Sequence, residues 1–65
     1  MNEDRPIIFT VKELQNGNYY SIETDDPRGC LLNEINYPKQ KVLWKMQDIA
    51  RRINNVGHAV LFEVE

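Results

Sequence analysis

The residues that offer most to a binding partner lie between positions 39 and 52. This stretch holds the only tryptophan, Trp44, and five of the eight lysine and arginine residues. Opposed only by Asp48, the five cations give the segment a net charge of +4. The cations are Lys39, Lys41, Lys45, Arg51 and Arg52. Tryptophan and arginine supply much of the binding energy at protein interfaces. The same composition would also let an indole stack on a nucleobase while cations contact phosphates.

Side chains that could perform catalysis or bind metal are scattered. Cys30 follows glycine and precedes two leucines, a setting typical of a small buried apolar side chain and not of an activated thiolate. His58 has no second histidine and no neighbouring nucleophile in sequence. Glu23, Asp25 and Asp26 are close together but lack the ligand order of a calcium loop, which indicates a solvated turn. We therefore predict no catalytic residues, no metal site and no cofactor.

A helical repeat positions the basic segment. Apolar residues recur at i, i+4, i+7, i+8 and i+11, which predicts one amphipathic helix over residues 37–54. They are Val42, Met46, Ile49, Ala50 and Ile53. Asn36 is expected to cap this helix, with Pro38 in its first turn. Gly57 and the asparagines before it are expected to end it with a left-handed cap.

Trp44 is expected on the opposite side of that helix from the apolar stripe. At 100° per residue it lies roughly 170° from the centre of the stripe. Lys41, Asp48 and Arg51 are its helical neighbours at i−3, i+4 and i+7, and Lys45 follows it directly. We predict that Trp44, Lys41, Lys45, Asp48 and Arg51 form a partner-binding surface.

Four segments have the composition of strands. Residues 7–14 and 19–24 are rich in β-branched and aromatic side chains and flank Asn16-Gly17, a pair suited to a hairpin turn. Residues 30–35 predict a short third strand, and residues 59–64 a last one. Residues 25–29 combine aspartates, proline and glycine and predict the turn between the second and third strands.

These elements predict an α+β fold in the order β-β-(β)-α-β. We expect a small antiparallel sheet of three or four strands with one amphipathic helix packed on one face. One helix covers one face only, yet the first and last strands carry apolar residues on both faces, among them Ile8 and Leu61. We therefore expect the chain to form a homo-oligomer, such as a homodimer, through a face or an edge of the sheet.

Length and composition limit the chain to one domain over residues 1–65, with residues 1–5 expected to be a loose tail. A hydrophobic content of 42% with 28% charged residues argues against disorder. No apolar run approaches the roughly 20 residues that span a bilayer, so we expect no membrane partner. A polar, acidic start and a single cysteine lead us to expect a cytoplasmic location.

Residues from Phe9 to about Asn54 resemble the HicB-like antitoxin domain. The resemblance rests on Asn16-Gly17-Asn18-Tyr19-Tyr20, on Asp26-Pro27-Arg28-Gly29-Cys30, and on the amphipathic helix through Val42, Met46, Ile49 and Ile53. It covers roughly two thirds of the chain. It implies a β-β-β-α-β fold, oligomerisation, and neutralisation of a small partner toxin that degrades RNA.

The function predicted from these observations is a non-catalytic protein-interaction module, such as an antitoxin or small regulator. Its partner would be another protein, such as a toxin, bound through the basic helix face around Trp44. Two alternatives remain open: single-stranded nucleic-acid binding by the same helix face, and a structural subunit that assembles through its sheet.

Overall fold

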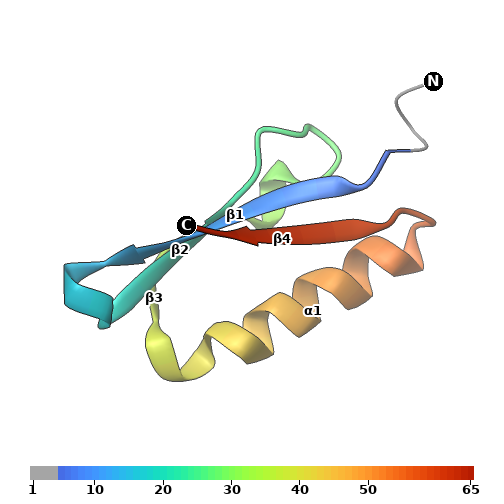
Figure 1. The fold of residues 1–65 in the computed structure, drawn as a ribbon. Helices are drawn as coiled ribbons and strands as arrows, with labels where there is room; N and C mark the ends of the chain where they lie inside the picture. The colour runs from blue at the N-terminus through green and yellow to red at the C-terminus, as the bar shows by residue number, and fades with distance from the viewer. Residues whose placement is uncertain (1–4) are drawn as a thin grey trace.

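The computed structural model describes residues 5–65 as a four-stranded sheet with one helix packed across it (Figure 1). The strands lie in the order β3-β2-β1-β4. Their bounds are Ile7–Leu14 for β1, Tyr19–Glu23 for β2, Glu34–Pro38 for β3 and Val60–Val64 for β4, and α1 spans Val42–Asn55. Of the tail predicted for residues 1–5, all but Arg5 lies outside the described residues.

The α+β fold class is confirmed, but the sheet is mixed instead of antiparallel. β1 pairs antiparallel with β2, and β2 antiparallel with β3, whereas β4 runs parallel to β1. The prediction of a fully antiparallel sheet was therefore wrong for one strand pair. The segment from β3 through α1 to β4 is a crossover that carries the chain from one edge of the sheet to the other. Parallel strands need such a long connection, which a helix usually supplies.

The predicted hairpin is confirmed. Leu14 of β1 lies opposite Tyr19 of β2, and the residues between them make the turn. Asn16 and Gly17 have φ of 58° and 87°, the left-handed values that Asn-Gly accepts readily, and Gln15 joins them at 50°.

The third strand begins later than predicted. Residues Cys30–Leu32 form a 3-10 turn, and β3 starts at Glu34. The cause lies in Asn33, whose Oδ1 accepts from the Thr24 backbone N–H at 2.8 Å and whose Nδ2 donates to the Thr24 carbonyl at 3.1 Å. These two bonds close the loop that precedes the strand, so pairing with β2 starts only after Asn33.

The helix also begins later than predicted. Asn36 and Pro38 lie in β3 and do not cap the helix, and a 3-10 turn over Lys39–Lys41 precedes α1. Its end is as predicted: Gly57 has φ of 87°, its N–H donates to the Asn54 carbonyl, and the His58 N–H donates to the Ile53 carbonyl. This pair of bonds is a Schellman motif, which satisfies carbonyls that the last helical turn leaves unpaired.

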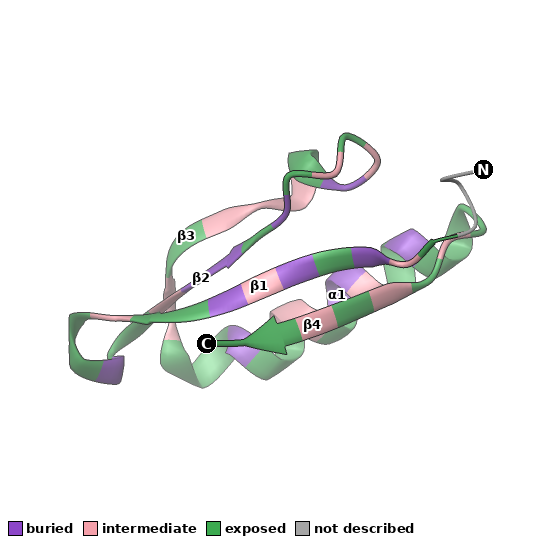
Figure 2. Ribbon diagram, turned by 45° about the horizontal axis from the view of Figure 1, so that its top comes forward, coloured by how far each residue is buried: buried purple, intermediate pink, exposed green. Residues whose placement is uncertain are grey.

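The core lies between α1 and one face of the sheet. Buried residues alternate with more exposed ones along β1, as the colours of Figure 2 show. The buried apolar side chains are Ile7, Phe9, Val11, Ile22, Val42, Ile49 and Ile53. Met46 and Phe62 are partly buried against them, and the Phe62 ring lies 5.7 Å from that of Phe9. The predicted apolar stripe therefore faces the sheet.

The other face of the sheet is less apolar than the sequence suggested. Its aliphatic residues Ile8 and Leu61 lie side by side in the β1–β4 register and are about half exposed. Along the same strands, this face also carries the charged residues Lys12 and Glu63, both exposed. An apolar pair of this size is ordinary on a protein surface.

Candidate functional site

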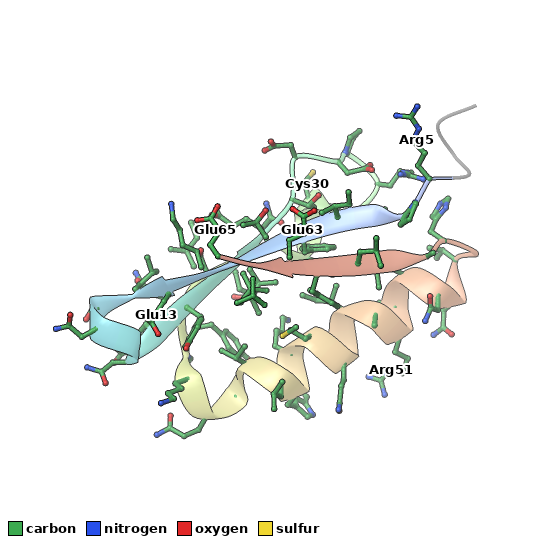
Figure 3. The ribbon with its side chains drawn as sticks, viewed as in Figure 1. Arg5, Glu13, Cys30, Arg51, Glu63 and Glu65 are labelled. Carbon is green, nitrogen blue, oxygen red and sulfur yellow. The ribbon has the colours of Figure 1, made fainter. Side chains whose placement is uncertain are left out.

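The side of α1 that faces away from the sheet carries Trp44. The indole is 61% exposed, as the helical periodicity predicted. Arg51 follows Trp44 by seven residues, which places both on one line along the helix. Figure 3 shows the Arg51 side chain extending from α1 away from the sheet. The structure thus brings an aromatic ring and a guanidinium to one outward surface.

Asp48 lies between Trp44 and Arg51 and binds two arginines. Arg51 Nη2 donates to Asp48 Oδ1 at 2.6 Å, and Arg52 Nε donates to Asp48 Oδ2 at 2.9 Å. The Asp48 side chain is nearly inaccessible although it lies far from the core face, so its shielding comes from neighbours on the helix. The hydrogen bond from Arg52 is the largest cause that lowers the pKa of Asp48, followed by the one from Arg51.

A shallow hollow of about 240 Å³ opens among these residues. Trp44, Gln47, Asp48 and Arg51 line it. Sequence reasoning missed Gln47, although its position three residues after Trp44 places it on the adjacent helical turn. It also left Arg52 out of the site, although the i+4 spacing from Asp48 predicts their ion pair. We call Trp44, Gln47, Asp48 and Arg51 the Trp44 surface.

Lys45 is not part of the Trp44 surface. Its Nζ lies 3.2 Å from a carboxylate oxygen of Glu34 on β3 and 5.9 Å from the centre of the Tyr37 ring. Its side chain is only 15% exposed, because it leans over the sheet between α1 and β3. Lys45 therefore fastens α1 to β3. Lys41, in contrast, is exposed in the 3-10 turn that precedes Trp44.

The remaining chemically reactive side chains do not converge. Cys30 is exposed and not buried, because it starts a surface 3-10 turn in which its Sγ lies 3.9 Å from the Pro27 carbonyl oxygen. The Nδ1 atom of His58 is buried without a hydrogen-bond partner in residues 5–65. Cys30 and His58 form no hydrogen bond with each other.

The acidic turn after β2 is organised by Arg28. Arg28 Nη2 donates to Asp26 Oδ2 at 2.6 Å and Nε to Oδ1 at 3.0 Å, and the Arg28 backbone N–H also bonds Oδ1. These hydrogen bonds lower the pKa of Asp26 to about 2. An open hollow of about 460 Å³ lies beside the turn on the outer sheet face. Its lining includes Glu23, Asp25 and Asp26, but no group of three potential metal ligands occurs within residues 5–65.

Comparison with protein-family models, with curated proteins and with solved structures finds no match to this chain. Over residues 5–65, no helix has the length and apolar character that crossing a bilayer requires.

Proposed function

We propose that this chain is a non-catalytic interaction module that binds another protein through the Trp44 surface. The observation that carries the proposal is the exposure of Trp44, the only tryptophan, which is 61% accessible. It lines the hollow together with Asp48, whose carboxylate is bound by two arginines. A large aromatic side chain at a concave site can be desolvated almost completely by a partner. Residues of this kind dominate binding energy at protein interfaces.

The ion pairs around Asp48 support this proposal in a second way. Arg51 and Arg52 hold the carboxylate at 2.6 and 2.9 Å, so both guanidinium groups are positioned before any partner arrives. A preorganised surface loses less side-chain entropy on binding. Charges at the rim would then set the association rate and the choice of partner.

The same pairing disfavours nucleic acid as the partner. Three of the five cations between positions 39 and 52 are already matched by carboxylates: Lys45 by Glu34, and Arg51 and Arg52 by Asp48. Phosphate binding relies on cations that exchange small counterions for the nucleic-acid backbone. Cations that already pair with carboxylates of the same chain release fewer counterions and therefore contribute less to phosphate binding.

The resemblance to HicB-like antitoxins suggests what the partner is. The order β-β-β-α-β is the one that the resemblance implies, which supports a small toxin as the partner. We place the protein in the cytoplasm as part of the same proposal, because an exposed, unpaired Cys30 suits a reducing compartment.

Replacement of Trp44 tests the binding surface. Wild type and Trp44→Ala, each immobilised, are used to capture proteins from a lysate of the source cells, and quantitative mass spectrometry compares the captured sets. The wild-type protein should enrich one protein, whose purified form should bind Trp44→Ala about 30-fold more weakly, because truncating such an anchor costs about 2 kcal/mol or more. Val56→Ala is the matched control, since Val56 is similarly exposed at the C-terminal end of α1.

The single tryptophan provides a direct readout of the same contact. Titration of the wild-type protein with the purified partner should shift the indole emission to shorter wavelength as water leaves the ring. Unchanged emission together with equal binding of Trp44→Ala would contradict the proposed surface. Fluorescence anisotropy with labelled oligo-dT and oligo-rU at 50 and 200 mM salt would reveal the nucleic-acid alternative through steep salt dependence.

A further inference from the structure

The two edges of the sheet differ in how they are protected. β3 contains Pro38, has Asn36 at φ of 59°, and pairs with β2 through a shifted register between Tyr20 and Ile22. Proline, bulges and irregular backbone are the devices by which sheet edges avoid pairing with other chains. β4, the other edge, lacks proline and positive φ and pairs with β1 in unbroken register over five residues.

The backbone groups that β4 presents at its edge can be identified. The Ile7 N–H donates to the Ala59 carbonyl, and the Glu65 N–H donates to the Val11 carbonyl, both at 2.9 Å. Successive backbone groups of a strand point to opposite sides. The odd-numbered residues from 59 to 65 therefore face β1, and the N–H and C=O groups of Val60, Phe62 and Val64 face outward. Within residues 5–65, no strand pairs with this side of β4.

We propose that a second copy of this chain pairs with β4, antiparallel and about a two-fold axis at Phe62. This register places Phe62 opposite Phe62 of the second copy, and Val60 opposite Val64. Each of these is a hydrogen-bonded pair, in which opposite residues exchange both N–H···O bonds. All six outward N–H groups of the two strands are then satisfied, and the two sheets join into one of eight strands.

Alternative symmetric registers leave groups unpaired. An axis at Leu61 pairs Val60 with Phe62 and sets Val64 opposite His58, whose N–H already donates to the Ile53 carbonyl and cannot reach the Val64 carbonyl. An axis at Glu63 pairs Phe62 with Val64 and leaves Val60 outside the paired β4 strands, which end at Val64. Because unsatisfied backbone groups in an interface cost free energy, the Phe62 register is favoured.

The side chains suit this register. On the outer face, Leu61 lies opposite Glu63 of the second copy, so carboxylates do not face each other directly. On the helix face, Val60 lies opposite Val64, whose side chain is 72% exposed. Leu43, 73% exposed, lies on the flank of α1 away from Lys45 and β3, and hence toward β4. The side chains of Val64 and Leu43 would both become less accessible to water in the dimer.

The size of this contact determines its expected strength. A standard interface buries about 800 Å² per partner, roughly a sixth of the 4796 Å² of accessible surface. Five paired residues with two flanking aliphatics cover less, so the dimer belongs among small interfaces. We expect an equilibrium between monomer and dimer that depends on protein concentration.

Sedimentation velocity over a range of protein concentrations tests whether the chain dimerises through the β4 edge. Wild type should shift from monomer to dimer, whereas Val64→Pro should raise the dissociation constant at least tenfold. Proline removes an outward N–H that β1 does not use, so the fold should survive. Val64→Lys is a second variant that places a charge at the edge strand. Far-ultraviolet circular dichroism verifies that both variants are folded.

Two controls distinguish dimerisation through the β4 edge from dimerisation through the β3 edge or through the Trp44 surface. Ile35→Lys changes a 63% exposed aliphatic residue on β3, the protected edge, and should leave dimerisation unchanged. Trp44→Ala should also leave it unchanged, because the Trp44 surface faces away from the sheet. A wild-type protein that stays monomeric, a Val64→Lys variant that dimerises normally, or an Ile35→Lys variant that does not dimerise would each overturn the proposal.

Disulfide trapping tests the register. In a Cys30→Ser background, Leu61→Cys and Glu63→Cys chains are mixed and oxidised. The Phe62 register places these two positions directly opposite, so the mixture should yield a disulfide-linked heterodimer and neither chain alone should do so. Efficient cross-linking of Leu61→Cys with itself would indicate the Leu61 axis and overturn the assigned register.

Discussion

Asp26 and Asp48 are both held by arginines close in sequence, but their surroundings differ. Asp26 ties a turn together through Arg28, whose Nη2 also donates to the Arg5 carbonyl at 3.2 Å. Asp48 instead organises a helix surface through Arg51 and Arg52. The first arrangement joins a turn to the start of the described chain, and the second fixes two arginines on the outer surface of α1.

Asp26 should make stability depend on acid pH. Its pKa is about 2 in the folded protein against an ordinary value of 3.8, so its contribution is complete above pH 3.8 and is lost as pH falls toward 2. Urea unfolding between pH 2 and 5 should show the free energy of unfolding falling through this window. Asp48 adds a change of the same sign, because its pKa is also lowered.

Substitution isolates the Asp26 contribution. Asp26→Asn should make the pH dependence between pH 4 and 2 less steep, whereas Asp25→Asn, which keeps the Asp26–Arg28 contact, should retain the decline. Equal pH profiles for wild type and Asp26→Asn would show that the Arg28 contact does not stabilise the turn.

At the residue scale, the sequence predicted which way the side chains of α1 point better than it predicted which residues they contact. Helical periodicity placed Trp44 outward because a 14-residue helix follows 100° per residue closely. It could not place Lys45, which lies at the boundary between the two faces and turns toward Glu34. Glu34 was assigned to a strand with different bounds, so its distance from Lys45 could not be anticipated. Cys30 was misplaced for a related reason: apolar neighbours in sequence do not imply a buried position.

At the scale of elements, the turn that ends α1 requires a left-handed backbone conformation at Gly57. Gly57 has φ of 87°, and a Cβ added there would meet no atom within 4 Å. Gly57→Ala should therefore cost about 1 kcal/mol through backbone strain alone. Gly57→Asn should cost less, since asparagine tolerates the left-handed region. Thermal unfolding of both variants checks this, and an alanine variant as stable as wild type would contradict the assigned cap.

Element boundaries departed from the sequence prediction where side chains bond the backbone. The sequence favoured a strand at residues 30–35 because of its aliphatic residues, but Asn33 binds both backbone groups of Thr24 and delays β3 to Glu34. Asn36 and Pro38 have the composition of a helix start, and the structure uses them in an edge strand instead. Propensity alone does not distinguish these uses, because tertiary pairing decides between them.

At the scale of the whole molecule, a small core makes each buried side chain important. Stability for 65 residues is expected at roughly 3–10 kcal/mol. Ile49→Ala removes a fully buried side chain and should cost about 2–5 kcal/mol, a large part of that total. Val56→Ala, at an exposed position, should change stability by less than about 0.5 kcal/mol. Urea unfolding measures both, and a small effect at Ile49 would contradict the assigned core.

The direction of β4 could not be obtained from its sequence. An alternating apolar pattern identifies a strand but is the same whether the neighbour runs parallel or antiparallel. The direction follows from the path of the chain. β3 runs parallel to β1 because both are antiparallel to β2, and α1 carries the chain back along the sheet, so β4 enters with the orientation of β1.

The parallel pairing of β1 with β4 also affects how the nascent chain acquires its structure. Ile7 is opposite Val60, fifty-three positions later. During synthesis, the β1–β2 hairpin is therefore made before α1 and β4, so Ile7, Phe9 and Val11 still lack the residues that cover them. Contacts so distant in sequence slow folding and prolong the exposure of apolar side chains. A chaperone that recognises extended apolar segments would find its target in β1 before β4 is translated.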